Sequence, residues 1–253
     1  MIDNPIVKHK PYIASITSGK GGVGKTFLSV NLATTLARAG KKVLVVDCDL
    51  GLANIDIMLG INPQHTLQEV IFGAMEIKDI VVPTKGGFDL VPSVSGVREM
   101  AQPLFEKIEM IKSVILSFRE YDIILLDTGA GISEVVLQFN LLATKNIVII
   151  NRELTCLTDA YAMIKVMFQV FGREAFSVVV NAATDENEAN RLFSHLDGIC
   201  KKFLGFSLHY LGYILQDDIV PISIMKQRIA VISMPHSPIV RNFLQIAKTV
   251  ASW

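Results

Sequence analysis

Short apolar runs alternate along the whole chain with longer segments in which apolar residues recur every three or four positions. Short runs rich in β-branched residues are typical of buried strands, and the longer repeat is typical of helices. The pattern predicts strands at Tyr12–Thr17, Lys42–Cys48, Phe88–Val91, Asp122–Asp127, Asn146–Ile150, Phe176–Asn181 and Tyr210–Ile214. It predicts helices between them at Lys25–Ala39, Thr66–Phe72, Leu104–Phe118, Ile132–Leu142, Thr158–Phe171, Glu186–Phe203 and Pro238–Ala251.

Strands that are apolar on both faces and separated by helices indicate a parallel sheet covered on both sides. The predicted fold class is therefore α/β, with a doubly wound, mostly parallel sheet and helices on both faces, and with its ligand at the carboxyl ends of the strands. No linker-like stretch divides the series, so residues 1–253 are expected to form a single domain. Residues 1–11 are predicted to be a flexible N-terminal segment and residues 237–253 an amphipathic C-terminal helix.

Composition narrows the function classes. The 24 Lys and Arg residues balance the 24 Asp and Glu residues, so bulk charge gives no support for binding nucleic acid or anionic lipid, although a local patch stays open. The three cysteines, Cys48, Cys156 and Cys200, do not have the spacing of a disulfide framework, a zinc site or an iron–sulfur site. The polar first residues do not resemble a secretory signal, and runs such as "NIVII" are too short to span a bilayer. We expect a cytoplasmic, soluble protein, and peripheral contact with the inner face of the cell membrane stays open.

The stretch "GKGGVGKT" matches the phosphate-binding pattern GxxxxGK[ST] between a predicted strand and a predicted helix. Glycines let successive backbone N–H groups point inward around an anion at the start of the helix. Lys25 is then expected to reach the β- and γ-phosphates of ATP, and the Thr26 hydroxyl to bind Mg²⁺. The alternative is a glycine-rich turn without a ligand. The residues predicted to bind nucleotide are Gly19, Lys20, Gly21, Gly22, Val23, Gly24, Lys25, Thr26, Phe27 and Asn181.

Three carboxylates follow or end predicted strands. Asp47 and Asp49 are two residues apart, and Asp127 follows four apolar residues in "IILLD". An Asp at a strand end can also simply cap a turn, but three of them beside a phosphate loop favour metal chemistry. We predict that Asp127 and Thr26 bind Mg²⁺, that Asp47 supports the metal, and that Asp49 orients the attacking water.

The residues then become recognisable as a family pattern. "KGGVGKT" resembles the deviant Walker A motif of the MinD/ParA group of ATPases, in which the early lysine is a signature. "DCDLGLANIDIMLG", "DTGAGIS" and "LTDAYAMIKVM" resemble the FlhG (FleN) branch, whose members are MinD-like regulators of flagellar number. The resemblance covers residues 12 to 250.

The resemblance implies a role for the second lysine of the loop. In this group ATP binding drives a face-to-face homodimer, and Lys20 would reach the phosphates of the partner subunit, adding positive charge as an arginine finger does. The alternative is a solvated loop lysine. Asn181 matches the position that reads the adenine edge, although it could equally be a turn residue. The segments after Asp49 and Asp127 would be switches ordered by the γ-phosphate.

The sequence departs from the branch in places. Residues 1–11 contain nothing like the N-terminal motif through which such proteins stimulate a flagellar GTPase, which puts that activity in doubt. Arg152, Leu154 and Leu215 stand where the branch usually has other residues, prolines among them, so the fine geometry of the nucleotide pocket is in question.

The last segment, "SPIVRNFLQIAKTVASW", has apolar residues at helical spacing. An interfacial membrane anchor usually has a polar face rich in Lys and Arg, whereas only Arg241 and Lys248 are cationic here. A core-packing helix is the favoured interpretation.

Together these observations favour a Mg²⁺-dependent ATPase that dimerises with ATP and regulates the number or placement of bacterial flagella. Its expected partners are a second copy of itself and a flagellar GTPase or a flagellar regulator or assembly protein. The alternatives are a MinD-like division-site selection ATPase, a ParA-like DNA segregation ATPase, and a nucleotide-locked scaffold without turnover.

Overall fold

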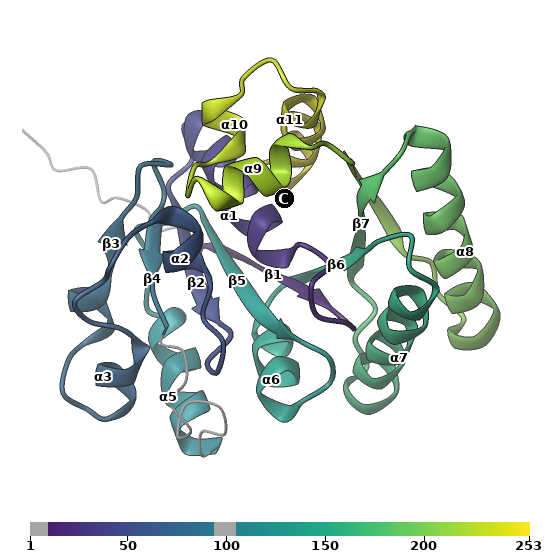
Figure 1. Ribbon diagram of the computed structural model, residues 1–253. Coiled ribbons are helices and arrows are strands. Elements are labelled where there is room, and N and C mark those ends of the chain that lie inside the picture. Colours follow the sequence, from purple (N-terminus) through teal and green to yellow (C-terminus); the bar gives the residue numbers. More distant parts are fainter. Residues whose placement is uncertain (1–9, 94–104) are drawn as a thin grey trace, which may run out of the picture.

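The computed structural model describes residues 10–93 and 105–253. Its centre is an 8-stranded sheet with the strand order β3-β4-β2-β5-β1-β6-β7-β8 (Figure 1). The strands are β1 Tyr12–Ser18, β2 Val43–Cys48, β3 Val82–Pro83, β4 Asp89–Val91, β5 Ile123–Ala130, β6 Lys145–Ile150, β7 Phe176–Ala183 and β8 His209–Leu215. All neighbouring strands pair in parallel except β3, which runs antiparallel to β4 at one edge.

Helices cover both faces of this sheet, which confirms the predicted doubly wound α/β fold (Figure 1). They are α1 Lys25–Arg38, α2 Ile55–Leu59, α3 Leu67–Ile71, η1 Ile77–Ile80, α5 Phe105–Ile115, α6 Glu134–Leu142, α7 Leu154–Phe171, α8 Glu186–Leu204, α9 Ile219–Met225, α10 Ala230–Ser233 and α11 Pro238–Val250. Alternate residues of each central strand face opposite layers. On β1, Ile13 packs among residues of α3, α5 and α6, whereas Ala14 and Ile16 pack in the cluster that holds α1 and α11.

The predicted strands and longer helices all have counterparts, and the differences lie in short elements and element ends. The sequence did not predict β3, α2, η1, α9 or α10, because each is too short to show a helical or strand period. Helix α7 begins at Leu154, four residues earlier than predicted. Residues 1–9 of the expected N-terminal segment and the predicted helix start at Leu104 lie outside the described residues.

Strand β1 occupies the centre of the sheet, between β5 and β6. The chain crosses from β5 past β1 to β6, so the strand order reverses here, and ligands of such sheets bind at this reversal beside the carboxyl ends of the strands. Asp47 on β2 lies directly opposite Asp127 on β5, and Ile16 on β1 lies opposite Asp127 on its other side. The sheet therefore brings the phosphate loop and the predicted carboxylates to one edge.

A buried polar network fastens β1 to its neighbours below that edge. The Ser15 hydroxyl donates to Asn140 Oδ1 of α6 at 2.7 Å, and Asn146 Nδ2 of β6 donates to Ser15 Oγ at 2.7 Å. Asn140 Nδ2 donates in turn to Thr17 Oγ1 at 3.1 Å. Because breaking one buried bond leaves its partner unsatisfied, this network fixes α6 against the strand that leads into the phosphate loop.

Helix α11 is a core helix, as the sequence favours. Ile239, Phe243 and Ile246 are fully buried, and the Phe243 ring meets Phe27 of α1 edge-on at a centroid distance of 5.9 Å. The terminal Trp253 packs against Tyr12, with ring centroids 5.3 Å apart. The apolar face that an interfacial anchor would need is thus already covered by the protein.

One helix of the described residues, α7, is long and apolar enough to cross a bilayer by length and composition alone. Core helices of soluble proteins meet the same criterion. The α7 side chains Cys156, Ala160, Met163 and Ile164 are buried, and the helix packs against β6 and β1. The core therefore accounts for the apolar residues on one face of α7, whereas Leu154, Val170 and Phe171 at its ends are exposed.

We predict that Phe243→Ala lowers the free energy of unfolding by about 3–5 kcal/mol, because it removes a fully buried ring and leaves a cavity. Leu244→Ala, at the neighbouring position where the side chain is 56% exposed, is expected to change it by less than about 0.5 kcal/mol. Urea unfolding followed by circular dichroism measures both. Equal losses in the two variants would contradict the packing of α11.

Candidate functional site

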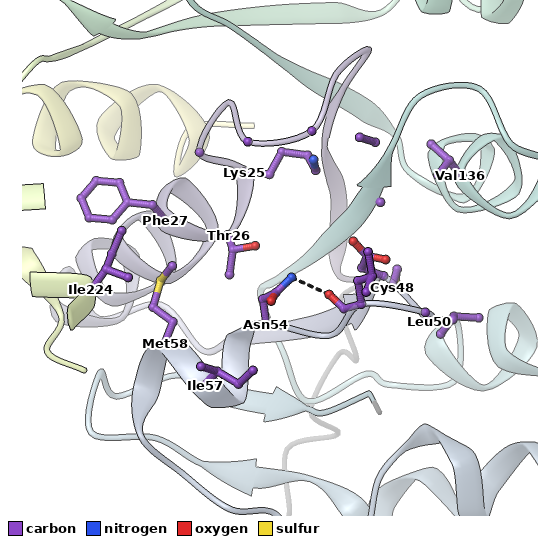
Figure 2. Close-up of a pocket in the computed structure, with 18 of the residues that line it drawn as sticks. Lys25, Thr26, Phe27, Cys48, Leu50, Asn54, Ile57, Met58, Val136 and Ile224 are labelled. Atoms are coloured by element: carbon purple, nitrogen blue, oxygen red, sulfur yellow. Dashed lines mark hydrogen bonds between the residues drawn. The ribbon is translucent and has the colours of Figure 1, made fainter. Parts of the chain in front are cut away.

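The phosphate loop joins β1 to α1 at the strand reversal. Gly22 and Gly24 have φ of 76° and 99°, in the left-handed region that favours glycine, and Gly24 is the N-cap of α1. The loop borders a cavity of about 1040 Å³ that Lys25, Thr26 and Phe27 also line (Figure 2). The helix N-terminus and the free N–H groups of the loop form a site for an anion.

Two loop glycines are required by packing. A Cβ at Gly19 would lie 2.1 Å from the Asp159 carbonyl carbon, so the loop lies directly against the backbone of α7. A Cβ at Gly24 would lie 2.3 Å from Asn181 Nδ2. Gly19 does not line the cavity, whereas Gly21 and Gly22 do. The sequence pattern assigned all of these glycines to phosphate, and the structure gives Gly19 a packing role.

Asn181, at the carboxyl end of β7, holds the loop from the outside. Its Nδ2 donates to the Val23 carbonyl at 2.8 Å. Asn181 does not line the cavity, and the next residue, Ala182, has a φ of 55°, which is unusual for a residue with a side chain. The adenine contact stays a prediction, and the observed contact positions the phosphate loop.

Asp127 is buried at the carboxyl end of β5. Its Oδ1 accepts a hydrogen bond from Ser29 Oγ at 2.7 Å, and the Thr26 hydroxyl also bonds to this carboxylate. Burial raises the pKa of Asp127 to about 6, while the bonds to Ser29 and Thr26 and the charge of Lys25 act in the opposite direction. A buried carboxylate beside a threonine hydroxyl and a lysine is well placed to hold a cation.

Asp47 fastens the segment that follows β2. Its carboxylate accepts from the backbone N–H groups of Asp49 at 3.1 Å, Asn54 at 3.3 Å and Ile55 at 3.4 Å, so it orders the turn into α2. Burial, followed by the charge of Asp127, raises the pKa of Asp47 well above its usual value. Metal support by Asp47 stays a prediction, and the observed role is to shape the loop that carries Asp49.

Asp49 and Lys25 both line the cavity. Burial raises the pKa of Asp49, and the charge of Lys25 lowers it. Burial lowers the pKa of Lys25, whereas Asp127 and Asp49 raise it. Lys25 Nζ donates to Ser18 Oγ at 3.1 Å. Lys25 and Asp49 thus line the same cavity, into which the outer phosphates of a nucleotide in the loop would extend.

Lys20 points away from its own phosphate loop. Its Nζ forms an ion pair with Glu153, the N-cap of α7, and donates to Thr155 Oγ1 at 3.1 Å. The hydrogen bond to Glu153 raises the pKa of Lys20, and the same contact lowers the pKa of Glu153. Lys20 does not line the cavity.

Sequence reasoning missed Glu153, Ser18 and Ser29. Ser29 lies one helical turn after Lys25 and Ser18 is the last residue of β1, positions that could have indicated proximity to the site. Nothing in the sequence indicated the pairing of Glu153 with Lys20, because the two residues are 133 positions apart.

The residues fit a nucleoside triphosphate with Mg²⁺. Mg²⁺ is usually held by one or two carboxylates together with substrate phosphates and water. The described residues contain no group of three or more His, Cys, Asp and Glu side chains arranged to hold a metal alone. Thr26 and Asp127 would supply protein ligands of such a shell, and phosphate oxygens bound in the anion nest would supply others.

Comparison with known proteins agrees with this geometry. Residues 12–170 match a family model described as an AAA domain. The chain is 37% identical to the antiactivator FleN of Pseudomonas aeruginosa over 97% of this chain and 88% of that protein. It is 29% identical to the flagellum site-determining protein YlxH of Helicobacter pylori, over 94% and 81%. The septum site-determining protein MinD of Pyrococcus horikoshii, solved with Mg-ADP, superposes with a TM-score of 0.80 at 27% identity, over 95% of this chain and 96% of that one.

We predict that Asp127→Asn makes the nucleotide-free protein more stable at pH 7.5, by about 1–3 kcal/mol. A raised pKa in the folded state means that ionisation of Asp127 opposes folding, so wild-type stability falls as pH rises from about 4 through about 6. The advantage of Asp127→Asn is therefore expected to shrink as pH falls through 6. Urea unfolding at several pH values measures it, with the exposed Glu106→Gln as control. An advantage that grows toward low pH would contradict the assignment.

Proposed function

The chain belongs to the AAA-domain ATPases of the MinD/ParA type, and from that premise we propose that it is a Mg²⁺-dependent ATPase switch regulating bacterial flagella. In this proposal ATP hydrolysis to ADP and phosphate controls pairing with a second copy. The observation that carries the proposal is that the two lysines of the phosphate loop lie in different places. Lys25 lies in the cavity with Asp49, whereas Lys20 lies outside it, at the surface.

The side chains have separable tasks in this mechanism. Backbone N–H groups of the loop bind the phosphate chain, and Lys25 neutralises its outer phosphates. Thr26 and Asp127 would hold Mg²⁺, which supplies charge neutralisation at the β- and γ-phosphates. Asp49 orients the attacking water, since it faces the same part of the cavity.

Lys20 completes the site of the other subunit. For this, its ammonium leaves Glu153 and meets the partner's phosphates, where it stabilises negative charge that develops in the transition state. The pair with Glu153 is exposed to solvent, and exposed ion pairs are weak, so it is easily exchanged. ATP binding thereby shifts the population from single subunits to pairs.

The flagellar role is supported by the names of the similar proteins. YlxH is a flagellum site-determining protein, and FleN is an antiactivator, which implies a regulatory partner. We propose a flagellar GTPase or a flagellar regulator as the partner of this chain. Division-site selection is the second candidate, because the fold also matches MinD.

We predict that Lys20→Ala lowers ATP turnover by about 100- to 1,000-fold and abolishes ATP-dependent pairing, because it removes charge supplied across the interface. Asp49→Ala is expected to lower turnover comparably while pairing persists, since Asp49 acts on the water. Phosphate release and light scattering after size exclusion measure these two properties.

The exposed Lys78→Ala is the matched control and is expected to behave as the wild type in both assays. Undiminished turnover in Lys20→Ala would rule out the contribution in trans. Loss of pairing in Asp49→Ala would show that Asp49 acts on nucleotide binding instead of the water.

For the flagellar role, we predict that deleting the gene changes the number or position of flagella per cell, counted by electron microscopy. Restoring the wild-type gene is expected to restore the pattern, and restoring the Lys20→Ala variant is not. An unchanged flagellar pattern together with misplaced division septa would favour division-site selection.

A further inference from the structure

A second hollow, next to the nucleotide cavity, is lined by residues of α2, the β3–β4 turn and α10 and of the segments beside them. It has a volume of about 350 Å³. We call it the α2–α10 groove, and it is lined by Leu59, Ile61, Thr84, Lys85, Gln227, Arg228, Ile229, Ile232 and Ser233. Leu59 and Ile229 are buried at its floor, and Ile232 is 39% exposed.

The rim of the groove is basic. Lys85 on the β3–β4 turn and Arg228 before α10 line the groove and are exposed, and Lys226, which precedes the lining residue Gln227, is exposed as well. On α2, the β3–β4 turn and the α9–α10 segment, the acidic residue is Asp56, whose Oδ1 accepts from the Ile57 N–H. The chain as a whole has a formal charge of zero, so this cluster is a local excess of positive charge around an apolar floor.

Gln227 connects the groove to the nucleotide cavity. It lines both hollows, and its Nε2 donates to the Ile57 carbonyl of α2 at 2.9 Å. Its φ is 50°, a conformation that residues with side chains adopt rarely and that persists only where surrounding contacts require it. A Cβ at Gly60 would lie 2.8 Å from Gln227 Oε1, so α2 ends directly against this side chain.

The same helix is tied to the nucleotide site at its other end. Asp47 accepts from the N–H groups of Asn54 and Ile55, at the start of α2. Helix α2 spans only Ile55–Leu59, so a movement of the segment after Asp49 displaces Ile57 and the Gln227 contact with it. Ile57 and Met225, which are 59% and 84% exposed, border both the cavity and this contact.

We propose that the α2–α10 groove binds a segment of a partner protein in which apolar side chains are flanked by Asp or Glu, and that nucleotide state alters its affinity through Gln227. The apolar floor takes the apolar side chains, and Lys85, Lys226 and Arg228 meet the carboxylates. A second copy seated symmetrically on this surface would place two basic rims together, which charge repulsion opposes. Nucleic acid would contact the cations and leave the apolar floor uncovered.

The docking is tested with peptides selected from a random 12-residue phage library against the wild-type protein. Selection against Lys85→Glu/Arg228→Glu removes peptides that bind elsewhere. We expect enriched peptides that combine Leu, Ile or Phe with Asp or Glu. Their affinity, measured by fluorescence anisotropy, is expected to fall at least about tenfold in that double variant and in Ile232→Ser.

The matched control is Lys165→Glu, which reverses an exposed charge on α7 and is expected to leave peptide affinity unchanged. Wild-type ATP turnover in all three variants shows that they fold. Failure to enrich acidic apolar peptides, or affinities insensitive to both groove variants, overturns the proposal. A shift to dimers caused by the wild-type groove alone, and absent in Lys85→Glu/Arg228→Glu, would assign the groove to a second copy and would also overturn it.

The coupling to nucleotide rests on the proposed function and is tested separately. Peptide affinity is compared with ADP and with a non-hydrolysable ATP analogue, in the wild type and in Gln227→Ala. We expect a difference of about five- to tenfold in the wild type and its loss in Gln227→Ala. Equal affinities in the wild type, with both nucleotides bound, overturn the coupling alone. Failure to bind either nucleotide would refute the ATPase proposal and leave the docking result standing.

Discussion

Two carboxylates, Asp47 and Asp127, lie opposite each other on adjacent buried strands, and the arrangement of the site follows from keeping them there. Removing charged groups from water is costly unless hydrogen bonds or opposite charges compensate. Three backbone N–H groups of the β2–α2 turn donate hydrogen bonds to Asp47, and the hydroxyls of Ser29 and Thr26 donate to Asp127. Because that compensation is incomplete, both pKa values are raised, and a cation with phosphate would complete it.

The compensation also ties separate elements to one edge of the sheet. Asp127 binds α1 through side chains of its first turns, and Asp47 binds the start of α2. On the far side of β1, the Ser15–Asn140–Asn146 network holds α6 and β6 in place. A change in the charge of these two carboxylates is therefore expected to act first on α1 and α2, the helices to which they bond.

Most of the fold, and the phosphate loop of the candidate site, could be predicted from local sequence. Long helices repeat apolar residues with a recognisable period, and buried strands form short apolar runs. The GxxxxGK[ST] pattern is specific because the backbone geometry of a phosphate loop requires those residues at that spacing. The contacts that local sequence could not predict join residues that are distant in the chain. Glu153 meets Lys20 and Gln227 meets Ile57 only after folding, and the 2.1 Å constraint on Gly19 comes from α7. The short helices α2, α9 and α10 are set by tertiary contacts, so no periodic pattern marks them.

The close approach of Gly19 to α7 constrains the start of the phosphate loop. With the backbone of α7 directly against it, the first residue of the loop has no room to shift toward that helix. The start of the phosphate loop and the second turn of α7 are thus packed together, and the ion pair between Lys20 and Glu153 joins the same two elements. In the proposed function, the segments after Asp49 and Asp127 are therefore the parts that would respond to the nucleotide, because this contact constrains the start of the loop that would bind it.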